Sequence, residues 1–131
     1  NVLIAALRSR RGASFELLRQ VGDPRWRLHC STALLLEYEE VARRQAADLW
    51  AQPERVEEVL DYLAVNAQEH AISFRWRPLL ADPDDDFLME LAVSAGARYI
   101  VTHNVKDFAG VERFGIEVVT PAQMLLKLRT T

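Results

Sequence analysis

Four aspartates crowd into residues 82–86, directly before an apolar run with helical spacing; they are Asp82, Asp84, Asp85 and Asp86. A helix start uses one capping carboxylate, and the helix dipole favours acids in the first turn. Capping and turn roles therefore account for the first two aspartates and, in part, for Asp86. Asp85 differs because it shares a helix face with the apolar Leu88 and Ala92 at i+3 and i+7. Its charge is the one that these ordinary roles explain least well.

A second carboxylate of this kind lies in the predicted helix of residues 31–44. Glu40 has two arginines one turn further along, and Glu39 has Arg43, so both have partners on a solvated face. Glu37 instead has Leu34 and Val41 at helical spacing, where an ionised carboxylate is costly unless a cation compensates it. The alternative is a position at the edge of the apolar stripe, from which the carboxylate reaches water.

Oxygen-bearing side chains also follow a predicted buried strand at residues 98–102. They are Thr102, Asn104 and Asp107, and each alone is an ordinary loop residue. Together with Glu37 and Asp85 they form three oxygen-rich places that we expect to converge at one sheet edge. Oxygen ligands without a matching set of His or Cys favour Mg²⁺ or Mn²⁺ over zinc. Such sites suit phosphodiester hydrolysis.

The elements that must position these residues alternate along the chain. We expect helices at 12–21, 31–44, 53–67, 85–95 and 121–128, and strands at 25–30, 70–74, 98–102 and 116–120. Ser14 and Ser31 are expected to cap the first two helices, and Gly96 is expected to end the fourth. This alternation predicts an α/β domain with a largely parallel sheet, in which functional groups gather beyond the carboxyl ends of the strands.

Composition limits the class of protein. The 131 residues are half apolar and 27% charged, as expected of one globular domain with its own core. A net charge of −3 argues against binding of nucleic acid through bulk positive charge, although local basic patches are compatible with it. The single cysteine, Cys30, excludes an internal disulfide and is expected to be a small core residue. No apolar run has the length of a membrane span, so a cytoplasmic protein is expected.

Two blocks carry a family resemblance: STALLLEYEEV, and DPDDDFLMELAVSAGARYIVTHNVKDF. Over nearly the whole chain the sequence resembles PIN-domain nucleases, most closely the bacterial and archaeal toxins of toxin–antitoxin pairs. The resemblance implies an α/β/α sandwich with a central, mainly parallel sheet. It also implies Mg²⁺- or Mn²⁺-dependent cleavage of single-stranded RNA, an antitoxin protein as partner, and a homodimer.

The resemblance assigns roles to residues. Glu37, Asp85 and Asp107 are the catalytic acids, and these acids and Asn104 are the metal ligands. Asn104 stands where many members of the family have aspartate. The supporting residues are Asn1, Ser31 and Thr102. The family opens with Asp-Thr-Asn at the end of its first strand, so we expect that strand and an Asp-Thr pair to precede Asn1, with residues 1–131 forming one domain.

The sequence indicates the residues that contact the RNA less clearly than it indicates the catalytic acids. Arg10, Arg11 and Arg44 are candidates for phosphate contacts, and Trp76, between two arginines, for stacking on a base. Solvated arginines and a core tryptophan are the alternatives. The histidines lack metal-ligand spacing, and only His103 falls in the site loop. The apolar helix 53–67 offers a surface for partners, or simply packs on the core.

Two other readings compete with a nuclease. A response-regulator receiver domain also clusters acids with a Thr and a Lys, but there these two residues end separate strands. Here Thr102 and Lys106 share one loop, which argues against it. The second reading is a catalytically degenerate PIN fold that serves as an interaction module, and Asn104 is compatible with it.

Overall fold

The computed structural model describes residues 1–50, 52–69 and 83–129, with the backbone alone at residues 69 and 83–87. Its α-helices are α1 (Val2–Arg8), α2 (Ala13–Arg19), α3 (Thr32–Arg44), α4 (Pro53–Asn66), α5 (Pro83–Ala95) and α6 (Pro121–Arg129). Its strands are β1 (His29–Cys30), β2 (Gln68–Glu69), β3 (Tyr99–Val101) and β4 (Glu117–Val119). Three short 3₁₀ helices are η1 (Ala46–Asp48), η2 (Val105–Phe108) and η3 (Val111–Phe114).

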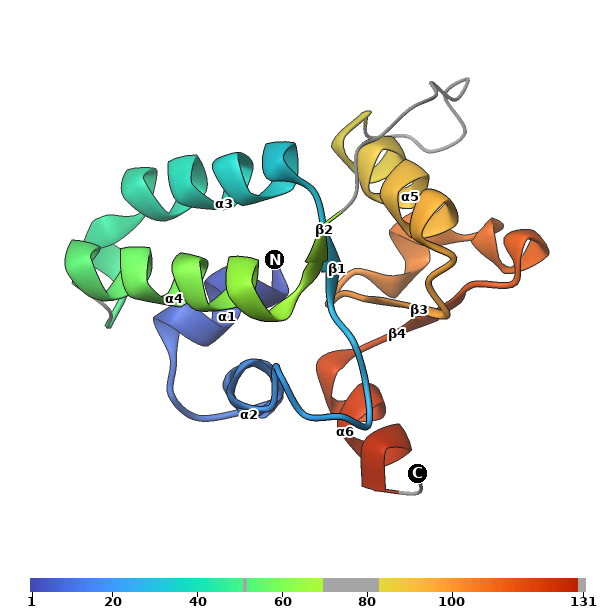
Figure 1. The fold of residues 1–131 in the computed structure, drawn as a ribbon, viewed down its shortest axis with the longest axis horizontal. Helices are drawn as coiled ribbons and strands as arrows, with labels where there is room; N and C mark the ends of the chain where they lie inside the picture. Colours follow the sequence, from blue (N-terminus) through green and yellow to red (C-terminus); the bar gives the residue numbers. More distant parts are fainter. Residues whose placement is uncertain (51, 70–82, 130–131) are drawn as a thin grey trace.

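Within the described residues the strands form two separate parallel pairs. β1 pairs with β2, and β3 pairs with β4 in the register Ile100 to Val118. The α3–α4 hairpin extends from one pair, and α5 lies beside the other (Figure 1). The α/β class is therefore confirmed, whereas a single central sheet between helical layers is not seen in this part of the chain.

The first predicted strand is much shorter than expected. Residues 25–28 are not part of a strand, and a turn occupies the start of this segment, where the carboxylate of Asp23 accepts the backbone N–H of Arg25 at 2.8 Å. Only His29–Cys30 remains as strand. The predicted strand at 70–74 falls outside the described residues, and β2 directly precedes it.

Helix boundaries follow the local signals closely. Ser31 caps α3 through its hydroxyl, which accepts the N–H of Leu34 at 3.1 Å, as predicted. Pro53 opens α4, where its missing N–H is no loss. Gly96 ends α5 with φ of 65°, and the next N–H, that of Ala97, bonds back to Ala92 at 2.9 Å. α5 begins at Pro83, two residues before the expected start, because proline suits a first helical turn.

The core is divided into three clusters. One joins α1, α3 and α4, and it includes Val56, Leu60 and Leu63 of α4. A second packs α5 on β3, with Met89 fully buried and Ala92 buried as predicted. A third joins α2, β4 and α6 around Leu17, whereas Phe15 and Leu18 of α2 are only partly buried. Cys30 is buried, which confirms its predicted place in the core.

Across the described part of the chain, no helix combines the length and the apolar character that crossing a membrane requires.

Candidate functional site

Asn1, at the start of the described chain, and Thr102, at the end of β3, are joined by hydrogen bonds. The amide nitrogen of Asn1 donates to Thr102 Oγ1 at 3.1 Å, and the side-chain oxygen of Asn1 accepts the N–H of His103 at 3.3 Å. Thr102 is only 4% exposed. These residues are about a hundred positions apart in sequence, so the contact is made by the fold and not by local structure.

Strand ends explain why these residues meet. Thr102 directly follows β3, and its N–H bonds to the carbonyl of Val119 at the end of β4, 2.9 Å away. Asn1 directly precedes α1 and lies at its N-cap position. Ser31 directly follows β1 and caps the next helix. In a parallel α/β fold these strand-to-helix junctions are where functional groups collect.

The loop after Thr102 carries two further candidate residues. The N–H of Asn104 donates to Thr102 Oγ1 at 3.1 Å, and the N–H of Asp107 donates to the carbonyl of Asn104 at 3.0 Å. The side chains of Asn104 and Asp107 are exposed, and buried Phe108 anchors the end of the turn. The structure thus connects Asn1, Thr102, Asn104 and Asp107 through one chain of hydrogen bonds.

Glu37 lies half-buried on α3, as does Glu39, whereas Glu40 is exposed. Arg43 pairs with Glu39, and Arg44 pairs with Glu40 at 3.9 Å, which confirms the predicted partners. The next residue, Tyr38, has a pKa raised to about 12, first because burial disfavours the charged phenolate and then because Glu37 and Cys30 are negative or potentially negative neighbours. Glu37 therefore carries its charge close to an interior face of α3.

Asp85 lies in the first turn of α5, but its side chain is outside the described residues. The described side chains contain no group of three or more His, Cys, Asp or Glu that could hold a metal ion. The convergence of Glu37, Asp85 and Asp107 therefore stays a prediction.

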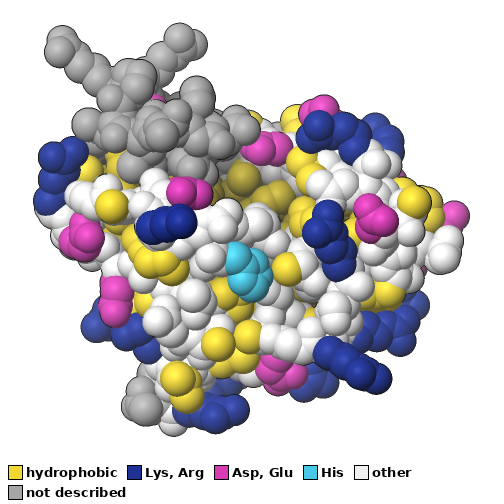
Figure 2. Space-filling model, turned by 180° about the vertical axis from the view of Figure 1, so that it is seen from behind, with side chains coloured by type: hydrophobic (Ala, Val, Ile, Leu, Met, Phe, Trp, Pro, Cys, Tyr) yellow, Lys and Arg dark blue, Asp and Glu magenta, His cyan; other side chains and the backbone are white. Residues whose placement is uncertain are grey.

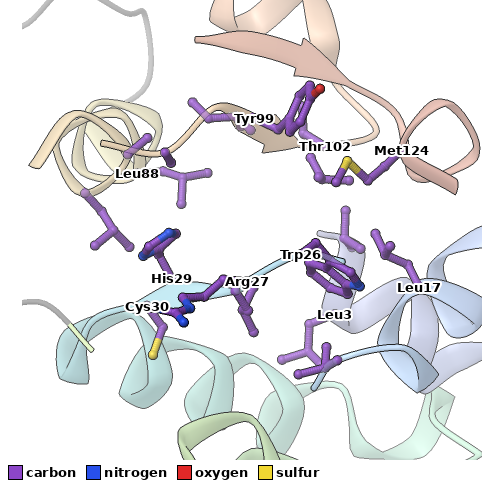
Figure 3. Close-up of a pocket in the computed structure, with 18 of the residues that line it drawn as sticks. Leu3, Leu17, Trp26, Arg27, His29, Cys30, Leu88, Tyr99, Thr102 and Met124 are labelled. Carbon is purple, nitrogen blue, oxygen red and sulfur yellow. The ribbon is translucent and has the colours of Figure 1, made fainter. Parts of the chain in front are cut away.

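A cavity of about 590 Å³ lies beside the polar junction. Side chains from β1, α1 and α2 point into it from one side, and side chains from β3, α5 and α6 from the other (Figure 3). Asn1, Ser14, Thr102, Arg27 and His29 are among its polar lining residues, and Leu3, Leu17 and Leu88 are among its apolar ones. The cavity separates the β1–β2 pair from the β3–β4 pair.

Ser14 plays a different part from the predicted one. The N-cap of α2 is Gly12, with φ of 104°, so Ser14 lies inside the helix and does not cap it. Its buried hydroxyl instead lies 2.8 Å from Nε2 of His103. The location of His103 in the site loop was the one sequence signal for this pair.

The candidate RNA-binding arginines lie apart from one another. The guanidinium of Arg10 stacks on the ring of Trp50 at 4.4 Å, Arg44 pairs with Glu40, and Arg11 is exposed. On the face shown in Figure 2, Lys and Arg side chains form several separate groups with Asp and Glu between them. The second group of candidates, Arg75, Trp76 and Arg77, lies outside the described residues.

Comparison with known proteins gives one match. A family model described as "PIN domain" matches residues 1–106, which include every candidate residue named above except Asp107. No curated protein and no solved structure gives a significant match to the chain.

Proposed function

Because the chain belongs to the PIN-domain family, a nuclease-type fold, we propose that it is a metal-dependent ribonuclease that cleaves single-stranded RNA. The observation that carries this proposal is the hydrogen-bonded junction of Asn1 and Thr102. It draws Asn104 and Asp107 to the end of β3, beside a cavity. The family resemblance assigns its catalytic site to this edge of the fold.

The residues present suit a hard divalent cation. Asp107 and Asn104 offer a carboxylate and an amide oxygen within one turn, both exposed. Glu37 and Asp85 supply the further carboxylates in the proposed site. A set made of oxygens alone selects Mg²⁺ or Mn²⁺. When bound, such an ion supplies a water of lowered pKa and offsets charge on the phosphate.

The chain's own residues have separable tasks in this proposal. Glu37, Asp85 and Asp107 bind the cation, and Asn104 contributes an oxygen with less charge than an aspartate. Thr102 and Asn1 fix the loop that carries two of these ligands. Ser31 fixes the start of the helix that carries Glu37. Water then attacks the phosphorus of one phosphodiester, and one P–O ester bond breaks.

The fold in this proposal is an α/β/α sandwich with a central, mainly parallel sheet, which the resemblance implies. The strands that support it are parallel within each pair, and residues of β1 and β3 line the same cavity.

Substrate and partners complete the proposal. Arg10, Arg11 and Arg44 are proposed to contact the RNA backbone, with Arg44 released from Glu40 when it does so. The resemblance further suggests a cytoplasmic toxin that pairs with an antitoxin protein and forms a homodimer. The exposed apolar residues Leu36, Tyr62 and Val65 on the α3–α4 hairpin support a partner surface there.

The test is cleavage of a generic single-stranded RNA with Mg²⁺ or Mn²⁺, with excess chelator as the blank. We expect cleavage by the wild type and a loss of about 100-fold or more in Glu37→Gln, Asp85→Asn and Asp107→Asn. Glu39→Gln is the matched control, because Glu39 lies half-buried on the same helix and pairs with Arg43, which is not among the proposed RNA contacts. Equal cleavage by Asp85→Asn and the wild type would remove the site assignment. A wild type that binds the metal but cleaves no RNA would favour the degenerate interaction module.

A further inference from the structure

Ser14 and His103 form the one described contact between α2 and the site loop that uses two polar side chains. The hydroxyl of Ser14 lies 2.8 Å from Nε2 of His103, although the residues are 89 positions apart. Ser14 is only 6% exposed, whereas His103 is exposed. A buried hydroxyl therefore holds Nε2 of an imidazole ring that belongs to an exposed residue.

The imidazole is held at its base as well. The backbone N–H of His103 donates to Asn1 at 3.3 Å, and the preceding Thr102 is buried and bonded to Asn1. With the backbone and Nε2 both fixed, the ring has little freedom to rotate. Among the described residues, Nδ1 of His103 has no hydrogen-bond partner.

The position of the ring proton decides what Nδ1 of His103 can do. A neutral imidazole carries one N–H donor and one acceptor nitrogen. When the Ser14 hydroxyl donates to Nε2, the proton of the ring resides on Nδ1, which is then a donor without a partner among the described residues. Asn104 and Asp107 follow in the same loop and present oxygens, so this N–H adds a hydrogen-bond donor beside them.

We propose that His103 Nδ1–H donates a hydrogen bond to a phosphate oxygen of bound single-stranded RNA, and that Ser14 is the positioning residue that fixes the ring and its tautomer. This rests on the proposed ribonuclease function and deepens it. Phosphate oxygens are the commonest acceptors in protein–nucleic acid contacts, and hydrogen bonds to a charged acceptor are the stronger kind. A purely structural clip between α2 and the loop is the competing account.

The first test measures RNA affinity without metal. Fluorescence anisotropy of a labelled single-stranded RNA in excess chelator reports binding while no cleavage occurs. His103→Ala should weaken binding about ten-fold, and Ser14→Ala about three-fold, in line with one hydrogen bond to a charged group. Because Ser14 acts through His103, the double variant should bind no more weakly than His103→Ala alone. Ser14→Thr retains the hydroxyl and should restore affinity.

Ser94→Ala is the matched control. Ser94 is also a serine within a helix, and its buried hydroxyl has no hydrogen-bond partner in the described structure, so its removal breaks no such bond. This variant should bind RNA like the wild type. Thermal unfolding of each variant shows whether a loss of affinity reflects a loss of fold. His103→Ala changes an exposed side chain and should leave the fold intact.

The second test determines the tautomer of His103. Nitrogen-15 chemical shifts of His103 in the wild type should show a protonated Nδ1 and an unprotonated Nε2, and Ser14→Ala should mix the two tautomers. A protonated Nε2 in the wild type would overturn the proposal, as would Ser14→Ala binding RNA like Ser94→Ala. Losses that multiply in the double variant would also overturn it. If the wild type cleaves RNA with Mg²⁺ or Mn²⁺ while these results are negative, only the inference about His103 fails. If the wild type cleaves no RNA with either metal, the proposed function fails.

Discussion

Replacing Thr102 with valine removes the hydroxyl that holds the site loop to Asn1. Valine has nearly the same shape and is also β-branched, so it fills the same space at the end of β3. The hydroxyl accepts two hydrogen bonds of 3.1 Å, one from the amide of Asn1 and one from the N–H of Asn104. Its contact with Asn1 Oδ1, at 3.5 Å, is at the limit of a hydrogen bond and is left out of the sum.

The expected cost follows from these two bonds. Each contributes about 1 kcal/mol net, so the upper limit is about 2 kcal/mol. Both bonds are only part-buried, so water can reach the two N–H groups when the hydroxyl is gone. No further penalty for buried unpaired donors therefore applies. We expect Thr102→Val to lower the free energy of unfolding by about 1 to 2 kcal/mol.

Two measurements check this value. Urea unfolding gives the free energy, and amide hydrogen exchange reports the loop directly. The amide of Asn104 should exchange faster in Thr102→Val, because it loses its acceptor, while amides in α4 far from the loop should change only by the global loss. Thr102→Ser retains the hydroxyl and should keep the Asn104 amide protected, although it loses a methyl group. A valine variant with unchanged stability and unchanged exchange at Asn104 would refute the role assigned to this hydroxyl.

Three further predictions concern the elements around the site. Ser31→Ala removes the cap of α3 and should cost about 1 kcal/mol in urea unfolding, while Ser9→Ala at an exposed turn costs less than half of this. Gly96→Ala forces a side chain into a left-handed conformation with no steric neighbour, so it should cost about 1 kcal/mol from the backbone alone. In the folded protein, Tyr38 should ionise at about pH 12 by ultraviolet titration. In the unfolded chain the same phenol ionises at about pH 10, so its contribution to the free energy of unfolding falls as the pH rises from about 10 to about 12. Tyr38→Phe should abolish this contribution. Unchanged stability in either of the first two variants, or ionisation of Tyr38 near pH 10, would contradict these assignments.

The sequence predicted those features of the fold that depend on residues close together in the chain, above all the ends of helices. The cap at Ser31, the proline start at Pro53 and the glycine stop at Gly96 depend on residues within one helical turn. The ion pairs of Glu39 and Glu40 are likewise set by helical spacing. The distinct environment of Glu37 followed from the same spacing, since its neighbours along the helix are apolar.

Contacts between segments far apart in the chain could not be predicted from helical spacing or capping residues. Serine is a common N-cap residue, so Ser14 was expected to cap a helix. Only the fold shows that Ser14 contacts His103 instead. The burial of Leu17 in place of Leu18 depends on how α2 meets α6, which the pattern within α2 does not specify. The length of β1 was overestimated because the turn at Asp23 competes with extended structure. Asn1 and Thr102 were each assigned to the site through the family resemblance, and the hydrogen bond between them is seen only in the fold.

The most direct test of the central claim is titration of the protein with Mn²⁺, followed by calorimetry. If Glu37, Asp85 and Asp107 share one cation, the wild type should bind one Mn²⁺, and each of Glu37→Gln, Asp85→Asn and Asp107→Asn should weaken binding by about ten-fold or more. Glu40→Gln should bind as the wild type does. Binding that is absent in the wild type, or unchanged in all three acid variants, would contradict the account.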